Sequence, residues 1–385
     1  MNWNKLKFKE FITLQRGFDL PVDEMNDGEV PVLGSIGIIG YHNKAKVNPP
    51  GVVTGRSGTI GVIQYTDKPY WPHNTSLWVK DFKSNRPKFV YYKMQTLTLD
   101  RFNGGASVPT LNRNTLDNLI VQVPDILMQE KIADILSSYD DLIDTNRRRI
   151  QLLEKSARLL FREWFVYFRF PCLRQGYGGQ AGREKVKIVE GVPVGWKRGK
   201  VKDLGVIVTG KTPSKKKVSS FNGAIPFIKT PDMHQSSIII NTEESLSEIG
   251  ADSQRNKYLP PWSILVSCIG TVGVVAMNFL RAQTNQQINS VIPNKEIYRY
   301  YSFFCLSRLK PLLEAIGGGS TMANVNKNKF ENLEVLIPSQ DILNEFHKAV
   351  DPIFKQVAIV FQQNQKLTQA RDLLLPRLMS GAIEV

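Results

Sequence analysis

The sequence predicts a mixed α/β (α+β) fold: two similar globular domains and two long antiparallel helices that form a coiled coil. Three observations lead to this expectation: an internal repeat of about half the chain, two long stretches with helical periodicity, and β-branched runs separated by Gly, Pro and Asn turns. The expected order is a first domain over 1–124, a long helix over 125–170, a Gly-rich linker or insertion over 171–190, a second domain over 191–340, and a second long helix over 341–385.

Within each globular domain, short β-branched runs alternate with turn residues, and this pattern predicts strands. The expected strands of the first domain cover 30–33, 51–54, 61–63, 76–79 and 119–123. Those of the second domain cover 206–208, 225–228, 264–266, 272–275 and 333–337. A helical stretch is expected near the end of each domain, around 86–100 and 297–316.

The two domains repeat each other at a nearly constant spacing. The stretch from Gly104 to Pro124 recurs 214 positions later, from Gly318 to Pro338, and Val52–Gly61 resembles Ile264–Gly273. A repeat of this period indicates a duplicated domain, and duplicated domains with pseudo-two-fold symmetry suit a target with two half-sites. Residues that recur in both halves are expected to be structural rather than specific to either half-site: Asn112, Asn114, Asn326, Asn328, Gly58, Gly61, Gly270 and Gly273.

The long helices are predicted from stretches in which apolar residues recur every three or four positions. Asn146 and Asn364 occupy matching places in the two apolar stripes, where a buried polar residue can fix the register of paired helices. The residues expected to pair the helices are Asn146, Leu153, Leu160, Phe361, Asn364 and Leu367. The alternative is that each helix is a core element of its own domain.

Two prolines bear on the second long helix. Asp351–Pro352 resembles a helix cap followed by a first-turn proline, which predicts that the helix begins there. Pro376 is expected to distort the end of the same helix. Near the end of the first helix, an aromatic cluster is expected to pack on the second domain or on a partner subunit: Phe161, Trp164, Phe165 and Phe168.

The charge of the chain indicates a polyanionic partner. The formal net charge is +15 over 385 residues, with net +5 in 1–120 and +8 in 191–340, against +2 in 121–190 and 0 in 341–385. The polyanion is either nucleic acid or an anionic membrane surface, and no run is long and apolar enough for a transmembrane helix. Three scattered cysteines fit a reduced cytoplasmic compartment better than a disulfide framework.

Several sequence features resemble catalytic or metal-binding motifs but lack an essential part. Gly205–Thr212 matches the phosphate-loop pattern GxxxxGK[ST], but its strand-like run lies inside the motif and no amphipathic helix follows. Asn48–Gly51 lacks the aromatic ring of an amino-methyltransferase loop. The four histidines are far apart and do not have metal-ligand spacing. The chain is therefore expected to bind rather than catalyse, with no catalytic or metal-ligating residue.

The combined pattern resembles the specificity subunit of type I restriction-modification enzymes. The segments that carry the resemblance are Pro124–Leu136, Arg158–Phe165, Gly195–Trp196, Thr209–Pro213, Asn285–Asn289 and Leu373–Gly381. The resemblance covers almost the entire chain, and the Gly-rich stretch near 176–182 departs from the family pattern.

The resemblance implies a division of labour. Each globular domain would be a target recognition domain that reads one half of a bipartite double-stranded DNA sequence. The paired helices would set the spacing and dock two modification (methyltransferase) subunits, and restriction (endonuclease and translocase) subunits would join. S-adenosylmethionine, ATP and magnesium would be bound by those partners, and this chain would bind no cofactor.

DNA contacts are expected from basic and polar residues in loops, since phosphates are bound by Lys and Arg and base edges by Arg, Lys, Asn, Gln, Ser or Thr. The candidates in the first domain are Arg56, Ser57, Arg101, Asn103 and Arg113. Those in the second domain are Lys211, Thr212, Ser214, Lys215, Lys216, Lys217, Lys229, Arg255 and Lys327. Two other functions stay open on sequence alone: a duplicated DNA-binding regulator that works without partners, and a P-loop NTPase at Gly205–Thr212.

Overall fold

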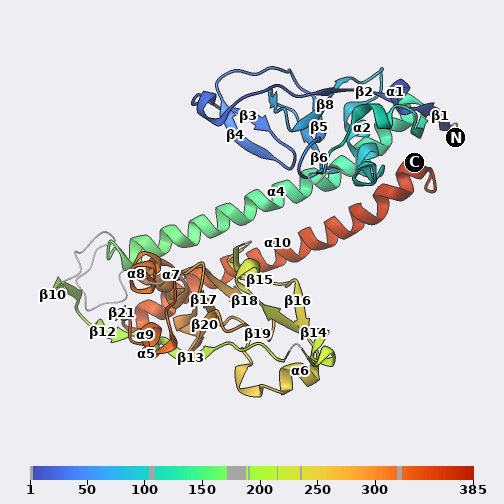
Figure 1. The fold of residues 1–385 in the computed structure, drawn as a ribbon. Helices are drawn as coiled ribbons and strands as arrows, with labels where there is room; N and C mark the ends of the chain where they lie inside the picture. Colours follow the sequence, from blue (N-terminus) through green and yellow to red (C-terminus); the bar gives the residue numbers. More distant parts are fainter. Residues whose placement is uncertain are drawn as a thin grey trace. The chain divides into compact units, whose positions relative to one another are not determined.

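In the computed structural model, the chain forms two compact units, each of which contains one globular domain and part of both long helices (Figure 1). Unit 1 comprises Met1–Thr145 and Gln365–Val385, and unit 2 comprises Asn146–Asn364. The structure describes residues 3–103, 109–170, 188–189, 191–214, 216–234, 236–318 and 323–385. The linker or insertion predicted over 171–190 lies almost wholly outside the described residues.

The globular part of unit 1 contains three antiparallel or mixed sheets. Strand β1 pairs with β9, a four-stranded antiparallel sheet has the order β2-β8-β5-β6, and a three-stranded sheet has the order β4-β3-β7. In chain order the elements are β1 (Trp3–Lys7), α1 (Phe8–Phe11), β2 (Thr13–Arg16), η1 (Val22–Glu24), β3 (Val30–Leu33), β4 (Ile38–His42), β5 (Gly51–Gly55), β6 (Ile63–Thr66), β7 (Trp71–Pro72), β8 (Ser76–Asp81), α2 (Pro87–Gln95), η2 (Leu99–Phe102), α3 (Arg113–Leu116) and β9 (Ile120–Pro124).

Unit 2 repeats this topology with additions. Its main sheet has the order β13-β20-β17-β18-β15, its second sheet β16-β14-β19, and β12 pairs with β21. In chain order the elements are β10 (Ile188–Val189), β11 (Val192–Pro193), β12 (Lys197–Lys200), α5 (Val201–Leu204), β13 (Gly205–Thr209), η3 (Val218–Ser220), β14 (Phe221–Ile228), η4 (Thr230–His234), β15 (Ile238–Ile239), β16 (Glu244–Leu246), α6 (Glu248–Asp252), η5 (Arg255–Lys257), β17 (Ile264–Ser267), β18 (Val275–Asn278), β19 (Gln283–Thr284), β20 (Ile288–Pro293), η6 (Glu296–Tyr298), α7 (Arg299–Arg308), α8 (Lys310–Gly317), α9 (Lys327–Glu331) and β21 (Glu334–Ile337).

The duplication seen in the sequence is therefore a duplication of the strand order. The order β2-β8-β5-β6 corresponds to β13-β20-β17-β18, and the parallel pair β3–β7 corresponds to the parallel pair β14–β19. Strand β15 and helix α6 have no counterpart in unit 1 among the described residues. The fold class predicted from sequence, a mixed α+β fold with an internal repeat, is confirmed.

The sequence placed one strand of each half too early, and the error is the same in both. Strands expected over 61–63 and 272–275 begin instead at Ile63 and Val275. Gly61 and Gly273 adopt φ values of +87° and +83°, a left-handed conformation that favours glycine and turns the chain before the strand starts. The β-branched residues before each strand therefore belong to the turn.

The two long helices are α4 (Ile126–Phe165) and α10 (Gln340–Ser380). In unit 1, Arg371 Nη1 donates to Asp140 Oδ1 at 2.6 Å. In unit 2, Asn146 Nδ2 donates to Asn364 Oδ1 at 2.9 Å and Arg149 Nη2 to Gln356 Oε1 at 3.0 Å. Because residue numbers rise along one helix as they fall along the other, the helices pair in antiparallel fashion within unit 2.

The predicted start of the second helix at Asp351–Pro352 is wrong, since α10 begins eleven residues earlier at Gln340 and continues through Pro352. The residues on both sides of the proline, Phe346, Val350 and Phe354, are at most 1% exposed. Burial of these side chains holds the helix together where the proline removes a backbone hydrogen bond. Helix α10 also continues through Pro376, where Leu378 and Met379 are buried in unit 1.

Each long helix also contributes to the cores of the globular domains, so the pairing and core interpretations of these helices both hold. In unit 1, Ile132 and Leu136 of α4 and Leu378 of α10 lie in one cluster with Phe11 and Phe89. In unit 2, the aromatic cluster at the end of α4 packs on the second domain: Phe161 and Phe165 contact Tyr301 of α7 and Phe346 of α10, with ring centroids 4.8 to 6.2 Å apart.

Candidate nucleic-acid interface

The loops that follow β2 and β5 and precede β8 meet at one edge of the main sheet of unit 1. Strand register places them together, because Arg16 at the end of β2 faces Leu77, and Gly55 at the end of β5 faces Ser76. We call these loops, residues 16–19, 55–61 and 73–76, the unit 1 loop cluster. Antiparallel strands that end at the same edge bring together residues that are far apart in sequence.

Unit 2 builds the same edge from β13, β17 and β20, and we call residues 209–214, 267–273 and 285–288 the unit 2 loop cluster. Backbone hydrogen bonds recur at equivalent positions of the two clusters. The Gly17 N–H donates to the Ser76 carbonyl at 3.0 Å, and in unit 2 the Gly210 N–H donates to the Ile288 carbonyl at 3.1 Å. The Phe18 N–H donates to the Pro72 carbonyl at 2.8 Å, as the Lys211 N–H does to the Thr284 carbonyl at 2.9 Å. The Arg56 N–H donates to the Thr75 carbonyl at 2.8 Å, as the Cys268 N–H does to the Gln287 carbonyl at 2.7 Å.

Close backbone contact explains the glycine at the start of each cluster. A Cβ atom on Gly17 would lie 2.1 Å from the carbonyl oxygen of His73, and one on Gly210 would lie 2.1 Å from that of Asn285. Neither position can hold a side chain without a shift of the turn. The duplicated glycine therefore sets how closely the two loops of each cluster approach.

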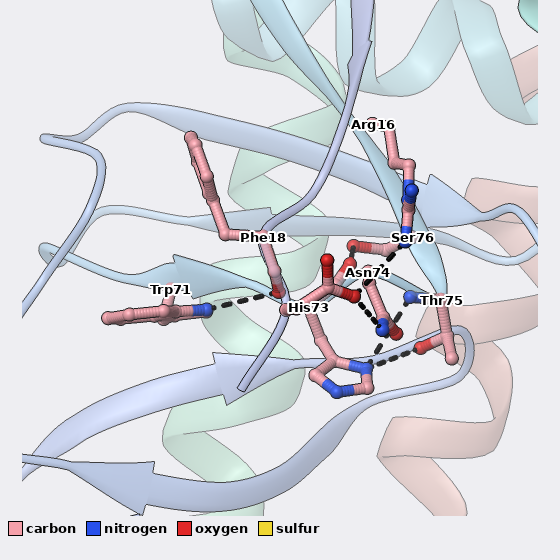
Figure 2. Close-up of polar contacts among 8 residues, drawn as sticks. Arg16, Phe18, Trp71, His73, Asn74, Thr75 and Ser76 are labelled. Carbon is pink, nitrogen blue, oxygen red and sulfur yellow. Dashed lines mark hydrogen bonds and ion pairs between the residues drawn. The ribbon is translucent and has the colours of Figure 1, made fainter. Parts of the chain in front are cut away.

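The unit 1 loop cluster presents several polar side chains together (Figure 2). Asn74 Nδ2 donates to Asp19 Oδ1, and Arg16 Nη2 forms an ion pair with the same oxygen at 3.1 Å. His73 Nδ1 lies 2.9 Å from Thr75 Oγ1. The hydrogen bond from Asn74, aided by the positive charges of Arg16 and Arg56, lowers the pKa of Asp19, so its carboxylate is ionised at neutral pH.

The unit 2 loop cluster presents different side chains on the same backbone. Thr212 Oγ1 donates to Gln286 Oε1 at 2.7 Å, and Asn285 Nδ2 donates to Gln287 Oε1 at 2.9 Å. Lys211 is exposed, and its carbonyl accepts from Gln254 Nε2 at 2.7 Å. This edge therefore combines amide, hydroxyl and ammonium groups.

Three of the DNA-contact candidates of the first domain lie in or beside the unit 1 loop cluster. Arg56 and Ser57 follow β5, and both are partly exposed. Asn103 is exposed and forms an antiparallel β-bridge with Leu111. The Leu111 N–H donates to the Arg56 carbonyl at 2.8 Å, which places Asn103 beside the unit 1 loop cluster. Arg101 is exposed on η2, and Arg113 donates to the Leu14 carbonyl at 3.4 Å.

The candidates of the second domain fall into two groups. Lys211, Thr212 and Ser214 lie in the unit 2 loop cluster, and Lys216 and Lys217 follow it as exposed residues. Lys215 lies outside the described residues. The other three side chains form ion pairs with carboxylates: Lys229 with Glu244, Arg255 with Asp252 at 2.6 Å, and Lys327 with Glu331 at 4.0 Å.

The shared residues of the repeat have structural positions. Asn112 caps α3 by accepting from the N–H of Asn114 at 3.0 Å, and Asn326 caps α9 by accepting from the N–H of Lys329 at 2.9 Å. The repeated glycines Gly58 and Gly270 have φ values of +87° and +77°. These residues shape the loops in both units, as the sequence predicted.

The phosphate-loop hypothesis for Gly205–Thr212 is contradicted by the structure. Residues Gly205–Thr209 form strand β13, which pairs along its whole length with β20. The next helical element among the described residues is the three-residue η3 at Val218–Ser220. A phosphate cradle needs a loop of inward amides followed by a helix N-terminus, and the described residues of this segment, 205–214 and 216–220, form neither.

Metal and thiol chemistry find no support in the part of the chain that the structure describes. Within it, no group of three or more His, Cys, Asp or Glu side chains could hold a metal ion. Burial raises the pKa of Cys268 and of Cys305 to about 11, so both thiols stay protonated at neutral pH. No helix in the described ranges is long and apolar enough to cross a membrane.

The sequence alone did not single out Asp19 or Asn74 as members of this site. Gln286 was named only as part of Asn285–Asn289, one of the segments that carry the resemblance. An available signal was the repeat itself. Extending the match of Val52–Gly61 with Ile264–Gly273 downstream at the same spacing aligns His73–Thr75 with Asn285–Gln287. No spacing argument of that kind reaches Asp19, because the offset between the halves changes upstream of β5.

Comparisons with known proteins match both halves of the chain. A family model described as "Type I restriction modification DNA specificity domain" matches residues 1–155 and 193–369. The chain is 35% identical over 327 residues to the type I restriction enzyme HindI specificity subunit of Haemophilus influenzae, covering 71% of each chain. It is 27% identical over 311 residues to the MjaIX specificity subunit of Methanocaldococcus jannaschii, covering 77% of this chain and 69% of that protein.

A solved structure shares the fold. The S subunit of a type I restriction-modification system from M. genitalium aligns with a TM-score of 0.63 at 15% identity, covering 98% of this chain and 96% of that one. The family model covers both globular domains, and the strand order and loop hydrogen bonds are duplicated between them. On these grounds, the chain belongs to the family of type I restriction-modification DNA specificity subunits.

Proposed function

We propose that this chain is the non-catalytic, DNA-reading subunit of a type I restriction-modification complex. Each loop cluster reads one half of a split double-stranded DNA sequence, and the antiparallel long helices fix the spacing between the halves. The observation that carries the proposal is the duplicated edge: the same backbone hydrogen bonds hold different exposed side chains in the two units.

The charge distribution supports DNA as the partner. The two globular segments hold +13 of the net charge of +15, since 1–120 carries +5 and 191–340 carries +8. Lys211, Lys216 and Lys217 are exposed at or just after the unit 2 loop cluster, where they can neutralise phosphates. Lys229 and Arg255 are already paired with carboxylates, so they are weaker candidates for this role.

The proposal includes protein partners and their cofactors. Two modification subunits dock on the long helices, and restriction subunits join the assembly, which works on DNA in the cytoplasm. In the unit 2 part of α4, Leu152 and Leu159 are 54% and 46% exposed and lie two turns apart on the same face, as a docking surface would require. S-adenosylmethionine, ATP and magnesium are proposed to bind the partners rather than this chain.

The experiment begins with co-purification of the chain and the modification subunit encoded nearest to it. The complex is then used to methylate a random duplex library, and modified adenines are located by sequencing. A single split motif with a fixed gap is the expected result. Methylation without any common motif would refute the proposal.

Two other outcomes separate the remaining functions. A chain that forms no complex but binds one split sequence tightly would be a regulator that works alone. A chain that forms a stable complex without methylating any DNA would contradict its role as a working reader. Replacement of both Leu152 and Leu159 by Ser is expected to weaken complex formation, whereas replacement of the exposed Leu280, which lies outside the helices, should not.

A further inference from the structure

The two loop clusters differ in chemistry at positions that are equivalent in backbone structure. Arg16 corresponds to Thr209, because they are the last residues of the equivalent strands β2 and β13. Ser76 corresponds to Ile288, because they are the first residues of the equivalent strands β8 and β20. Counting from these residues, Asp19 corresponds to Thr212 and Asn74 to Gln286. The hydrogen-bonded pair Asp19–Asn74 therefore occupies the same place as the hydrogen-bonded pair Thr212–Gln286.

Neighbouring side chains in the same loops form hydrogen bonds with the backbone of their own loop. His73 Nδ1 accepts from the N–H of Thr75 at 3.4 Å, and Asn285 Oδ1 accepts from the N–H of Gln287 at 3.1 Å. Each of these first residues therefore caps its own loop. In contrast, the hydrogen bonds of the Asp19–Asn74 and Thr212–Gln286 pairs join one side chain to another across two loops.

The two pairs are also accessible. The Asp19 side chain is 70% exposed, Gln286 is exposed, and Asn74 and Thr212 are partly exposed. Both hydrogen bonds recorded for Asp19 end on Oδ1, which leaves Oδ2 able to accept another. An ionised carboxylate at the edge of a basic domain repels phosphate, so its presence there suits contact with a base rather than with the DNA backbone.

We infer that Asp19 with Asn74, and Thr212 with Gln286, are equivalent base-reading pairs that give the two units different specificity. The inference rests on the proposed function and adds the residues that select the bases. Each pair is held in place by its internal hydrogen bond, so little side-chain freedom is lost when it meets the major groove.

The chemistry of the groups assigns a base class to each pair. A carboxylate accepts from the N4 amino group of cytosine, and Asp19 Oδ2 is placed to do so in unit 1. A glutamine amide can accept from N6 and donate to N7 of adenine, and in unit 2 Gln286 offers Nε2 together with the second lone pair of Oε1, since the first accepts from Thr212 Oγ1. The unit 1 pair therefore selects cytosine, and the unit 2 pair selects adenine, each at one position of its half-site.

The test exchanges the pairs between the units. The variants Asp19→Thr/Asn74→Gln and Thr212→Asp/Gln286→Asn are prepared as the full chain in complex with the modification subunit. Each complex selects DNA from a randomised duplex library, and the bound DNA is sequenced. The first variant should change one position of the unit 1 half-site from cytosine to adenine, and the second should make the opposite change in the other half-site.

The expected change is about 10- to 100-fold in relative base preference, as one side chain–base contact typically gives. The half-site read by the unchanged unit should keep its preference. The control is Asp67→Thr, the same substitution at an exposed residue that follows β6, at the opposite edge of the same sheet. This control should leave both half-sites unchanged.

The outcomes separate this inference from the proposed function. Exchange variants that bind with wild-type affinity and keep both preferences would overturn the inference and leave the function intact. A wild-type complex with no sequence preference would instead refute the function. If an exchange variant does not fold, Asp19→Asn keeps the shape of the side chain, and its preference for cytosine must still fall for the inference to hold.

Discussion

Replacement of Lys93 by methionine should stabilise unit 1 at neutral pH. Lys93 lies on α2 with only 6% of its surface exposed, and its Nζ donates to the carbonyl of Met379 near the end of α10 at 2.8 Å. The same Nζ lies 5.4 Å from the centroid of the Trp3 ring. Burial lowers the pKa of Lys93 to about 8, because the charged ammonium is poorly solvated there.

The magnitude follows from the two pKa values, about 8 in the folded chain and 10.5 when the side chain is free. Between pH 8 and pH 10.5 the Lys93 side chain is more protonated in the unfolded state than in the folded state, so the free energy of unfolding rises with pH. At pH 7 the penalty for the buried charge is about 3 kcal/mol, and at pH 9.5 about half of it remains. Methionine removes this penalty but loses a hydrogen bond that contributes about 1 kcal/mol.

The Lys93→Met variant should therefore be more stable than the wild type by about 2 kcal/mol at pH 7 and by less than about 1 kcal/mol at pH 9.5. Hydrogen–deuterium exchange of the α2 amides reports the stability of unit 1 within the full chain. Other groups that titrate are common to both proteins, so they cancel in the difference.

The matched control is Lys80→Met, since Lys80 is exposed at the end of β8. Its stability difference from the wild type should be the same at both pH values. A difference between Lys93→Met and the wild type that does not change with pH would refute the assignment of a buried, weakly basic amine.

Four further predictions concern the core, the helix pair and the loops. Phe346→Ala should cost about 3 to 5 kcal/mol in chemical unfolding of unit 2 and Phe346→Leu much less, because Phe346 is fully buried among four aromatic rings. Asn146→Leu or Asn364→Leu alone should destabilise by about 1 to 3 kcal/mol, and a double variant that costs as much as their sum would contradict coupling of the pair. Lys216→Ala should weaken binding to all DNA sequences and lower the slope of log affinity against log salt concentration by about 1. An unchanged slope would exclude a phosphate contact by Lys216. Gly210→Ala should displace the turn from Asn285 and reduce selectivity in the unit 2 half-site alone, as measured by library selection.

Much of the fold could be predicted because its signals are present in the linear sequence. The repeat is visible as matching residues at a constant spacing, and the long helices are visible as apolar residues every three or four positions. The aromatic residues near the end of α4 were expected to cover a neighbouring surface, and they lie against Tyr301 and Phe346. Each of these patterns is visible in the linear order of the residues, without knowledge of which residues meet in space.

The wrong prediction of where the second long helix begins involves competition between local preference and burial. Asp351–Pro352 has the local appearance of a helix start, but Asp351 instead accepts a hydrogen bond from Tyr300 at 2.8 Å, and the helix continues through Pro352. Burial of Phe346 and Phe354 outweighs the cost of a proline in the helix. No local pattern contains the packing that decides this.

The sequence by itself determined that the chain is a duplicated, basic, mixed α+β protein with two long helices, because periodicity, repetition and charge are properties of the sequence. Only the tertiary structure decided which polar residues meet. Asp19 and Asn74 are 55 positions apart, and Thr212 and Gln286 are 74 apart, yet each pair is joined by a hydrogen bond. Strand register brings them to one edge of a sheet, and register depends on packing across the whole unit.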